Sequence, residues 1–195
     1  ARSSIGYLVD LRGHGGSQGP QYEAPHTFQS CVEDIQATFE SPVMPPIGSV
    51  VGHSFGGRVA LQHAATNTNT PAEGTTTWLL DTVPGQAHDS VTKVIDAVST
   101  MDLENVATRK QAITTLHDDH GIDMGIAQWL ASSMTPQQKK KSDDDADEAT
   151  TSLTWGFDLN VIQSLLPEFA TQDFMRLVET ACSSDDTQTI HLVRG

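Results

Sequence analysis

The stretch Gly52-His53-Ser54-Phe55-Gly56 sets a serine between two glycines, a spacing that can present a nucleophilic hydroxyl for acyl transfer. An apolar run over 47–51 precedes it, and a helix-compatible run of small residues follows it. On such a strand-to-helix turn the central residue is strained, and its neighbours must have almost no side chain. The pattern therefore predicts Ser54 as the nucleophile. The backbone N–H of Phe55 starts the helix and is predicted to donate to a developing oxyanion.

A simpler alternative stays open, because a glycine-rich turn can join a strand to a helix without any chemistry. The strand before the motif, the helix after it and the extra Gly57, where the helix must pack closely on a sheet, favour the catalytic interpretation. His53 adjoins the serine, but on so tight a turn its side chain points away from it. We interpret His53 as a packing or supporting residue rather than as the catalytic base.

Strand-like and helix-like runs alternate along the chain, which is typical of a parallel α/β sheet. The predicted strands cover 5–9, 47–51, 77–80 and 189–193, and the predicted helices between them cover 27–39 and 58–65. Ligands of such sheets bind at the carboxyl ends of the strands. Ser54 and Asp81 both follow such ends, so Asp81 is a candidate for the acid that orients the catalytic base.

A polar, glycine-rich loop over 10–17 follows the first predicted strand. One interpretation makes His14 in this loop a catalytic base. We favour the other, in which Arg12 and His14 fix the chain by hydrogen bonds, because the histidine follows the serine in the chain order that this kind of turn predicts.

The alternation stops at residue 85, so the core is predicted over 1–85, with a return to it over 171–195. Residues 86–170 are predicted to form an inserted helical cap, because successive helical stripes occur with no strand between them. The helices predicted after residue 85 cover 91–98, 103–116, 122–134, 161–166 and 171–181. Pro167 is expected to end the fourth of them.

The run 139–152 inside the predicted cap is low in complexity and acidic, which predicts a solvated loop. A metal site built from this run would use the aspartates Asp143, Asp144, Asp145 and Asp147. The run lacks the glycine and the distal glutamate of a calcium loop, so we predict no metal there.

Composition excludes several classes of function. The chain has 11 Lys and Arg against 25 Asp and Glu, a formal net charge of −14, which disfavours nucleic acid or an anionic membrane surface as the main partner. No apolar run reaches membrane-spanning length. Cys31 and Cys182 lie outside any metal or redox spacing, which favours two free thiols in a soluble, intracellular protein.

With these motifs in hand, the chain resembles the α/β-hydrolase superfamily, and within it the group of α/β-hydrolase domain-containing protein 11 and small bacterial esterases. The residues that carry the resemblance are 9–15, 50–57, Leu80-Asp81 with Pro84, and 155–159. The resemblance implies a parallel-sheet core with a helical cap, and a serine esterase or thioesterase that forms an acyl-enzyme on Ser54. It further implies a small-molecule ester or thioester substrate and no metal or organic cofactor, and it leaves a protein partner open.

The resemblance leaves the other triad members open. The acid of the group matches Asp81, a second assignment falls near Asp158 and Asn160, and most of the superfamily places the acid after the strand that ends here near Gly195. The histidine is expected beyond Gly195, since none of the other histidines occupies a matching position: His26, His63, His88, His117, His120 and His191.

The chain starts near one predicted core strand and stops directly after another, so we expect a piece of a longer protein that has little activity by itself. The second oxyanion N–H would then precede Ala1, and the choice between cytoplasm, mitochondrion and plastid stays open. Two rival functions also stay open. One is a lyase or acyltransferase on the same scaffold, and the other is a non-catalytic hydrolase-fold module that binds a partner.

Overall fold

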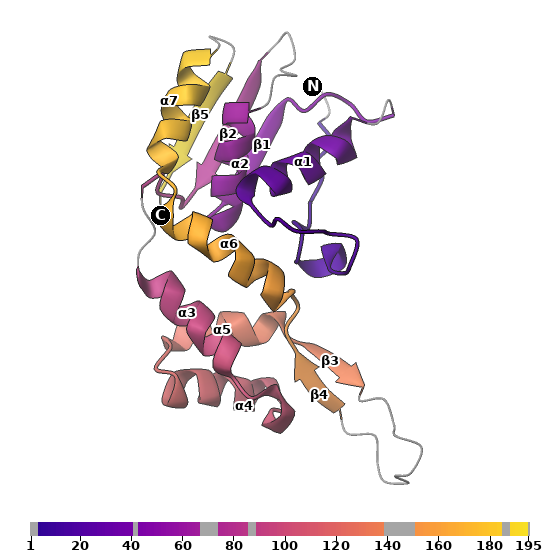
Figure 1. Ribbon diagram of the computed structural model, residues 1–195, viewed down its shortest axis with the longest axis vertical. Coiled ribbons are helices and arrows are strands. Elements are labelled where there is room, and N and C mark those ends of the chain that lie inside the picture. Colours follow the sequence, from indigo (N-terminus) through magenta and orange to yellow (C-terminus); the bar gives the residue numbers. More distant parts are fainter. Residues whose placement is uncertain are drawn as a thin grey trace. The chain divides into compact units, whose positions relative to one another are not determined.

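The computed structural model describes residues 4–40, 43–66, 74–85, 89–138, 151–184 and 188–194. The chain divides into two compact units (Figure 1). Unit 1 comprises Ala1–Arg12, Pro20–Ala87 and Ser164–Gly195, and unit 2 comprises Gly13–Gly19 and His88–Gln163. Each unit is described by itself.

A parallel three-stranded sheet in the order β1-β2-β5 forms the centre of unit 1. Its strands are β1 (Ser49–His53), β2 (Thr75–Leu80) and β5 (Gln188–Val193), so the strands predicted over 47–51, 77–80 and 189–193 are confirmed with small shifts of their ends. The register aligns His53 with Leu80 and Leu80 with Val193. The carboxyl ends of all three strands therefore lie at one edge of the sheet.

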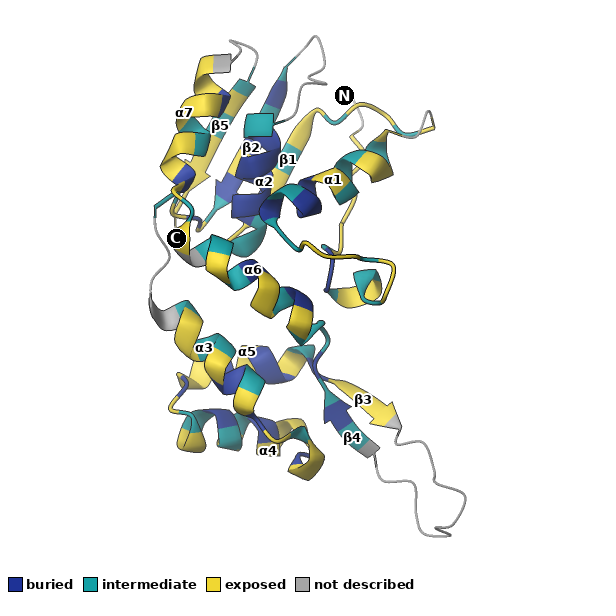
Figure 2. Ribbon diagram, viewed as in Figure 1, coloured by how far each residue is buried: buried dark blue, intermediate teal, exposed yellow. Residues whose placement is uncertain are grey.

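Helix α2 (Phe55–Thr66) packs directly on this sheet. It contacts β1 and β2 as well as two further helices, α1 (Phe28–Phe39) and α7 (Phe174–Ser184), and Figure 1 shows the three helices in front of the strands. All its residues from Gly57 to Ala64 are buried, which Figure 2 shows in dark blue. The helix that follows Ser54 is therefore held in place by the core of unit 1.

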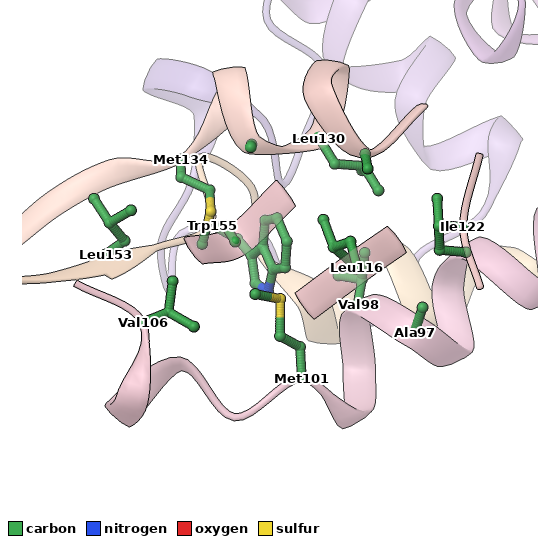
Figure 3. Packing of buried hydrophobic residues seen from close by; sticks show 13 residues of the cluster. Ala97, Val98, Met101, Val106, Leu116, Ile122, Leu130, Met134, Leu153 and Trp155 are labelled. Carbon is green, nitrogen blue, oxygen red and sulfur yellow. The ribbon is translucent and has the colours of Figure 1, made fainter. Parts of the chain in front are cut away.

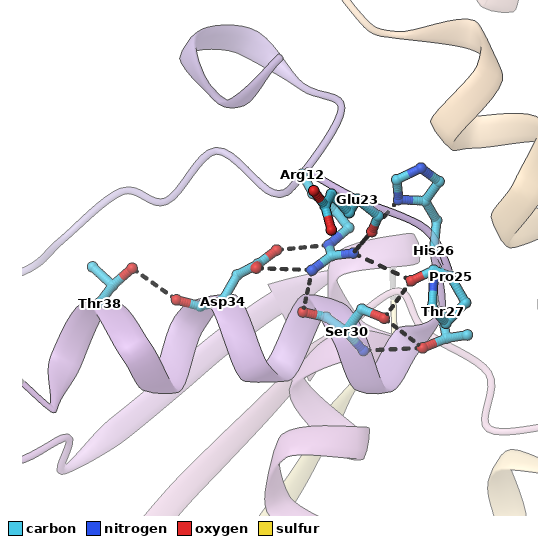
Figure 4. A network of polar contacts seen from close by, with 8 residues as sticks. All are labelled: Arg12, Glu23, Pro25, His26, Thr27, Ser30, Asp34 and Thr38. Carbon is cyan, nitrogen blue, oxygen red and sulfur yellow. Dashed lines mark hydrogen bonds and ion pairs between the residues drawn. The ribbon is translucent and has the colours of Figure 1, made fainter. Parts of the chain in front are cut away.

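Helix α1 confirms the helix predicted over 27–39, and its start is fixed by polar contacts (Figure 4). The Thr27 side chain accepts a hydrogen bond from the Ser30 N–H, as an N-cap does. Arg12 forms an ion pair with Asp34 at 2.7 Å and donates to the Ser30 carbonyl at 3.0 Å. Burial alone would lower the pKa of Arg12, but the Asp34 carboxylate raises it above the ordinary value. The expectation that Arg12 fixes the chain is confirmed.

The strand predicted over 5–9 is wrong. These residues form no strand and all are exposed, with Ile5 at 73% and Leu8 at 105% of full exposure. An apolar run becomes a strand only where a neighbour completes its hydrogen bonds. Within the described residues no strand pairs with this segment.

Unit 2 is mainly helical. It contains α3 (Asp89–Thr100), α4 (Arg109–Thr114), which continues as the π-helix η3 (Thr115–Asp119), and α5 (Met124–Ser133). Short 3-10 turns occur at η1 (Gly15–Ser17) and η2 (Leu103–Asn105). The single helix predicted over 103–116 is therefore wrong: the Thr108 side chain forms a capping box with Gln111 and starts a new helix there.

An antiparallel hairpin of β3 (Thr135–Gln138) and β4 (Thr151–Thr154) was not predicted from the sequence. The two strands are short and mostly polar, so their apolar alternation is weak. Residues 139–150 of the predicted acidic loop, with the four aspartates considered for a metal, lie outside the described residues.

A continuous apolar cluster fills unit 2 (Figure 3). Trp155 is 6% exposed, and Figure 3 shows its ring among side chains of the surrounding elements, including Met101, Leu116 and Met134. Leu116 and Met134 are fully buried. This cluster gives unit 2 a hydrophobic core that contains residues of unit 2 only.

Helix α6 (Leu159–Thr171) is longer than the helix predicted over 161–166. Pro167 lies inside it, so the prediction that Pro167 ends the helix is wrong. A proline inside a helix removes one backbone hydrogen bond, and here the helix continues past it for another turn. Helix α7 begins at Phe174, three residues after the start predicted for it, because the Asp173 carboxylate accepts from the Met175 N–H.

Candidate active site

Ser54 lies in a sharp turn between β1 and α2. Its φ is 50°, in the left-handed region that a residue with a side chain rarely adopts, and the residue is exposed. The Ser54 N–H donates to the Leu80 carbonyl at 3.1 Å, and the Ser54 carbonyl accepts from the Gly57 N–H at 3.0 Å. The turn is thus fastened to β2 on one side and starts α2 on the other, which is the geometry that the motif predicts.

Two glycines make this turn possible. A Cβ on Gly52 would overlap the Gly56 carbonyl, and a Cβ on Gly57 would overlap the Thr82 hydroxyl. A Cβ on Gly56 would have no atom within 4 Å, so the expectation that space requires this glycine is wrong. The tight approaches are between the start of α2 and both β1 and the segment that follows β2.

Asp81 lies in a second strained turn, directly after β2. Its φ is 45°, and its N–H donates to the Val193 carbonyl at 2.7 Å. Among the described residues, Ser54 and Asp81 are the only non-glycine residues with a positive φ. Such backbone strain costs about 1–3 kcal/mol per residue and clusters at functional sites. The structure therefore sets two strained, exposed polar residues at the ends of neighbouring strands.

Thr82 connects the two turns. It is 7% exposed, and its hydroxyl lies 3.2 Å from the Ser54 carbonyl and 3.0 Å from the Leu80 carbonyl. Its side chain also fills the space above Gly57. The start of α2 and the end of β2 are therefore held at a fixed separation.

Arg58, which the sequence analysis did not single out, supports the same region from α2. It is 6% exposed, and its guanidinium donates to the carbonyls of Gly85 at 3.1 Å and Val83 at 3.4 Å. A third bond at 3.1 Å reaches the Phe169 carbonyl in α6. Burial lowers the pKa of Arg58 from its ordinary value. No local pattern could have found these bonds, since all three acceptors are distant in sequence.

Comparisons with known proteins concern the family and the fold of the chain. The sequence pattern of the alpha/beta hydrolase family matches residues 2–190. The chain belongs to the alpha/beta hydrolase family. No curated protein matches the sequence of this alpha/beta hydrolase.

Solved structures of other proteins are similar to this chain at low sequence identity. A bromoperoxidase from Bacillus anthracis is 12% identical, with a TM-score of 0.52 and coverage of 95% of this chain and 71% of that one. An esterase from Exiguobacterium antarcticum is 15% identical, with a TM-score of 0.46 and coverage of 94% and 70%. At such identities the likeness to the bromoperoxidase concerns the fold alone.

The structure does not pair Ser54 with a histidine. Within the described residues, no hydrogen bond joins the Ser54 hydroxyl to an imidazole. His53 is exposed at the end of β1, so the packing interpretation is wrong: it alternates with the buried Gly52 and faces the other way. His63 is buried, and neither of its ring nitrogens has a hydrogen-bond partner in the part of the chain that the structure describes. His191 stacks on Trp78, with ring centroids 4.1 Å apart.

Two of the remaining candidates, Asp158 and His14, have structural partners in unit 2. The Asp158 carboxylate accepts from the N–H groups of Asn160 and Val161, which caps α6. His14 forms an isolated backbone bridge with Phe157. His88 lies outside the described residues. In the structure, therefore, Asp158 caps α6, whereas Asp81 lies beside the serine turn.

Neither a cluster of metal ligands nor a membrane-spanning helix occurs in the described residues. No group of three or more His, Cys, Asp or Glu residues is arranged there to hold a metal ion. None of the helices described combines the length and apolar character needed to cross a membrane. Both cysteines are free, and burial raises the pKa of the Cys31 thiol to about 12.

Proposed function

We propose that this alpha/beta hydrolase is a serine hydrolase that cleaves a carboxylic ester or thioester through an acyl-enzyme on Ser54. The observation that carries the proposal is the exposed serine at φ 50° between a strand end and a helix N-terminus. The overlap that a Cβ on Gly52 or Gly57 would cause supports it. A turn this restricted is explained by the need to present one hydroxyl.

The reaction follows from the position of the serine. Ser54 Oγ forms a bond to the carbonyl carbon, a histidine takes the hydroxyl proton, and the carbonyl electrons move to the oxygen. This oxyanion accepts a hydrogen bond from the Phe55 N–H at the start of α2. The carbonyl then re-forms, the bond to the alcohol or thiol breaks, and the leaving group takes the proton from the histidine. Water repeats both steps and releases the carboxylic acid.

Asp81 is the acid that we propose for the triad. Its strained turn lies at the end of the strand next to β1, and its backbone is tied to Val193. A carboxylate in this place would hold the histidine in the correct tautomer and stabilise the imidazolium. We propose that the histidine itself follows Gly195 in a longer protein, and an acid in that later segment is the rival to Asp81. Within the family, we propose that this chain is related to the group of α/β-hydrolase domain-containing protein 11.

Hydrolysis of p-nitrophenyl esters by the full-length gene product that contains this chain tests the proposal. We expect Ser54→Ala to lower kcat/KM at least about 1,000-fold, because the nucleophile is lost. Ser132→Ala is the matched control, since this serine is exposed in unit 2 and its hydroxyl only donates to the Trp129 carbonyl. Equal activity of the two variants would overturn the proposal.

The 195 residues by themselves are expected to hydrolyse little of the same ester. Turnover by this shorter chain that disappears in Ser54→Ala would place the catalytic base within it and contradict the position that we propose for the histidine.

A further inference from the structure

Arg58 is a buried cation with an unusual set of partners. Within the described residues, no carboxylate forms an ion pair with it, and its bonded partners are the backbone carbonyls of Val83, Gly85 and Phe169. Its guanidinium also lies over the rings of Phe169, at 4.2 Å, and Phe174, at 4.4 Å. A buried charge without a counter-ion is costly unless dipoles and ring faces stabilise it. A neutral side chain would fill this space at a smaller cost in free energy. We therefore expect the buried charge to have a specific role.

The acceptors of Arg58 indicate what the charge does. Val83 and Gly85 follow Asp81 closely, in the segment that leaves β2, whereas Arg58 stands in the first turns of the helix that begins after Ser54. The Arg58 N–H also donates to the Ser54 carbonyl at 3.3 Å. One residue therefore contacts the serine turn through its backbone and the segment after Asp81 through its side chain.

Backbone strain makes this connection significant. A positive φ at a residue with a side chain persists only where the surrounding structure imposes it. The N–H of Asp81 is held by Val193 on one side, and the carbonyls of Val83 and Gly85 are held by Arg58 on the other. Without Arg58 these two carbonyls lose this donor, and the turn keeps only the Val193 bond and the hydrogen bonds of Thr82.

We propose that Arg58 is a positioning residue that holds the Asp81 turn against the helix of the nucleophile and so keeps the Asp81 carboxylate in place to orient the catalytic histidine. This inference rests on the proposed function, in which Asp81 is the acid. The planar guanidinium suits the task because it can donate in several directions while it lies over two aromatic rings. A lysine ammonium keeps three N–H donors but lacks the planar group that lies flat against a ring.

The test uses Arg58→Met and Arg58→Lys in the full-length gene product, with kcat and KM measured per active site titrated with a fluorophosphonate. We expect kcat to fall about 10- to 100-fold in Arg58→Met, because a small misplacement of a catalytic group has effects of this size. The KM is expected to change less than about 3-fold, because the residue does not touch the substrate. Arg58→Lys should recover part of the loss.

The pH profile separates positioning from a merely structural role. A nearby carboxylate raises the pKa of the catalytic histidine, so a displaced Asp81 lowers it. The rising limb of kcat/KM against pH, which follows the neutral histidine, should therefore move to lower pH in Arg58→Met, and by less in Arg58→Lys. Arg109→Met is the matched control: Arg109 donates to the Met134 carbonyl in unit 2, and its loss should leave the limb in place.

The outcomes are distinguishable. Wild-type kcat per titrated site and an unmoved pH limb in Arg58→Met would overturn the inference while leaving the proposed function intact. If Arg58→Met does not fold, Arg58→Lys decides, and wild-type kinetics in that variant would overturn the inference. If Ser54→Ala retains wild-type activity, the proposed function itself fails.

Discussion

Unit 1 buries polar side chains, whereas unit 2 has a continuous apolar interior. Every buried polar or charged residue of the described part of the chain lies in unit 1: Arg12, Ser30, Arg58, Gln62, His63, Thr75, Thr77 and Thr82. The apolar cluster around Trp155 lies entirely in unit 2. Buried polar groups fix geometry at a cost in stability, while apolar packing adds stability without directing chemistry. Substitutions in the two units should therefore have different consequences.

Asp81→Asn in unit 1 should give the largest effect, and it should act on activity alone. The amide keeps the shape of the side chain but cannot hold the histidine in the correct tautomer, so kcat should fall about 10,000-fold with the melting temperature unchanged. Ester hydrolysis by the full-length gene product measures this, with the exposed Asp119→Asn in unit 2 as control. A kcat close to that of the wild type would show that another residue is the acid of the triad.

Leu116→Ala in unit 2 should instead lower stability and leave the reaction at the serine in place. Leu116 is fully buried in the apolar cluster, and its truncation leaves a cavity that costs about 2–5 kcal/mol of unfolding free energy. Urea denaturation measures the loss, and the fluorophosphonate reaction at Ser54 should persist under native conditions. A loss of less than about 1 kcal/mol would show that this cluster does not stabilise unit 2 as described.

Gly57→Ala sharpens the comparison because it adds a single methyl group where α2 closely approaches Thr82 in unit 1. The new Cβ would overlap the Thr82 hydroxyl, so we expect a loss of about 1–3 kcal/mol in the free energy of unfolding. The double variant Gly57→Ala with Thr82→Ala removes the overlap and should recover part of the loss. If the losses in unfolding free energy from the two substitutions simply add in the double variant, the overlap between a Cβ at position 57 and Thr82 is contradicted.

His63 should give the smallest effect, which depends on pH. Burial lowers its pKa in the folded protein, while the unfolded chain takes up the proton near the ordinary value of 6.5. The unfolded state therefore binds more protons below that pH, and stability falls as the pH falls, by at most about 1.4 kcal/mol per pH unit from this group. His63→Leu should flatten the dependence between pH 7 and the lowered pKa, as chemical denaturation at several pH values would show. If the slope of the unfolding free energy against pH is unchanged in His63→Leu, this histidine does not cause the pH dependence.

Local patterns in the sequence predicted the elements that carry the candidate site. The apolar runs of β1, β2 and β5 and the glycines at 52 and 57 are local signals that the structure bears out, whereas a side chain at Gly56 would meet no neighbour. The Phe55 N–H at the start of α2 follows from the same motif. The roles of Ser54, Phe55 and Asp81 in catalysis stay predictions.

Features that depend on distant partners were missed. The run over 5–9 is as apolar as a strand, yet no strand of the described part pairs with it. Pro167 was expected to end a helix that in fact continues to Thr171. The bonds of Arg58 reach carbonyls up to 111 residues away, and the positive φ of Asp81 depends on its neighbours in space. Pattern and propensity describe neighbours in sequence, and these features come from tertiary contacts.

The most direct test of the central claim is to locate the fluorophosphonate adduct in the full-length gene product by mass spectrometry of its peptides. We predict a single adduct on the Ser54 hydroxyl, absent in Ser54→Ala and retained in Ser132→Ala. An adduct on another residue, or ester hydrolysis without any adduct on Ser54, would contradict it.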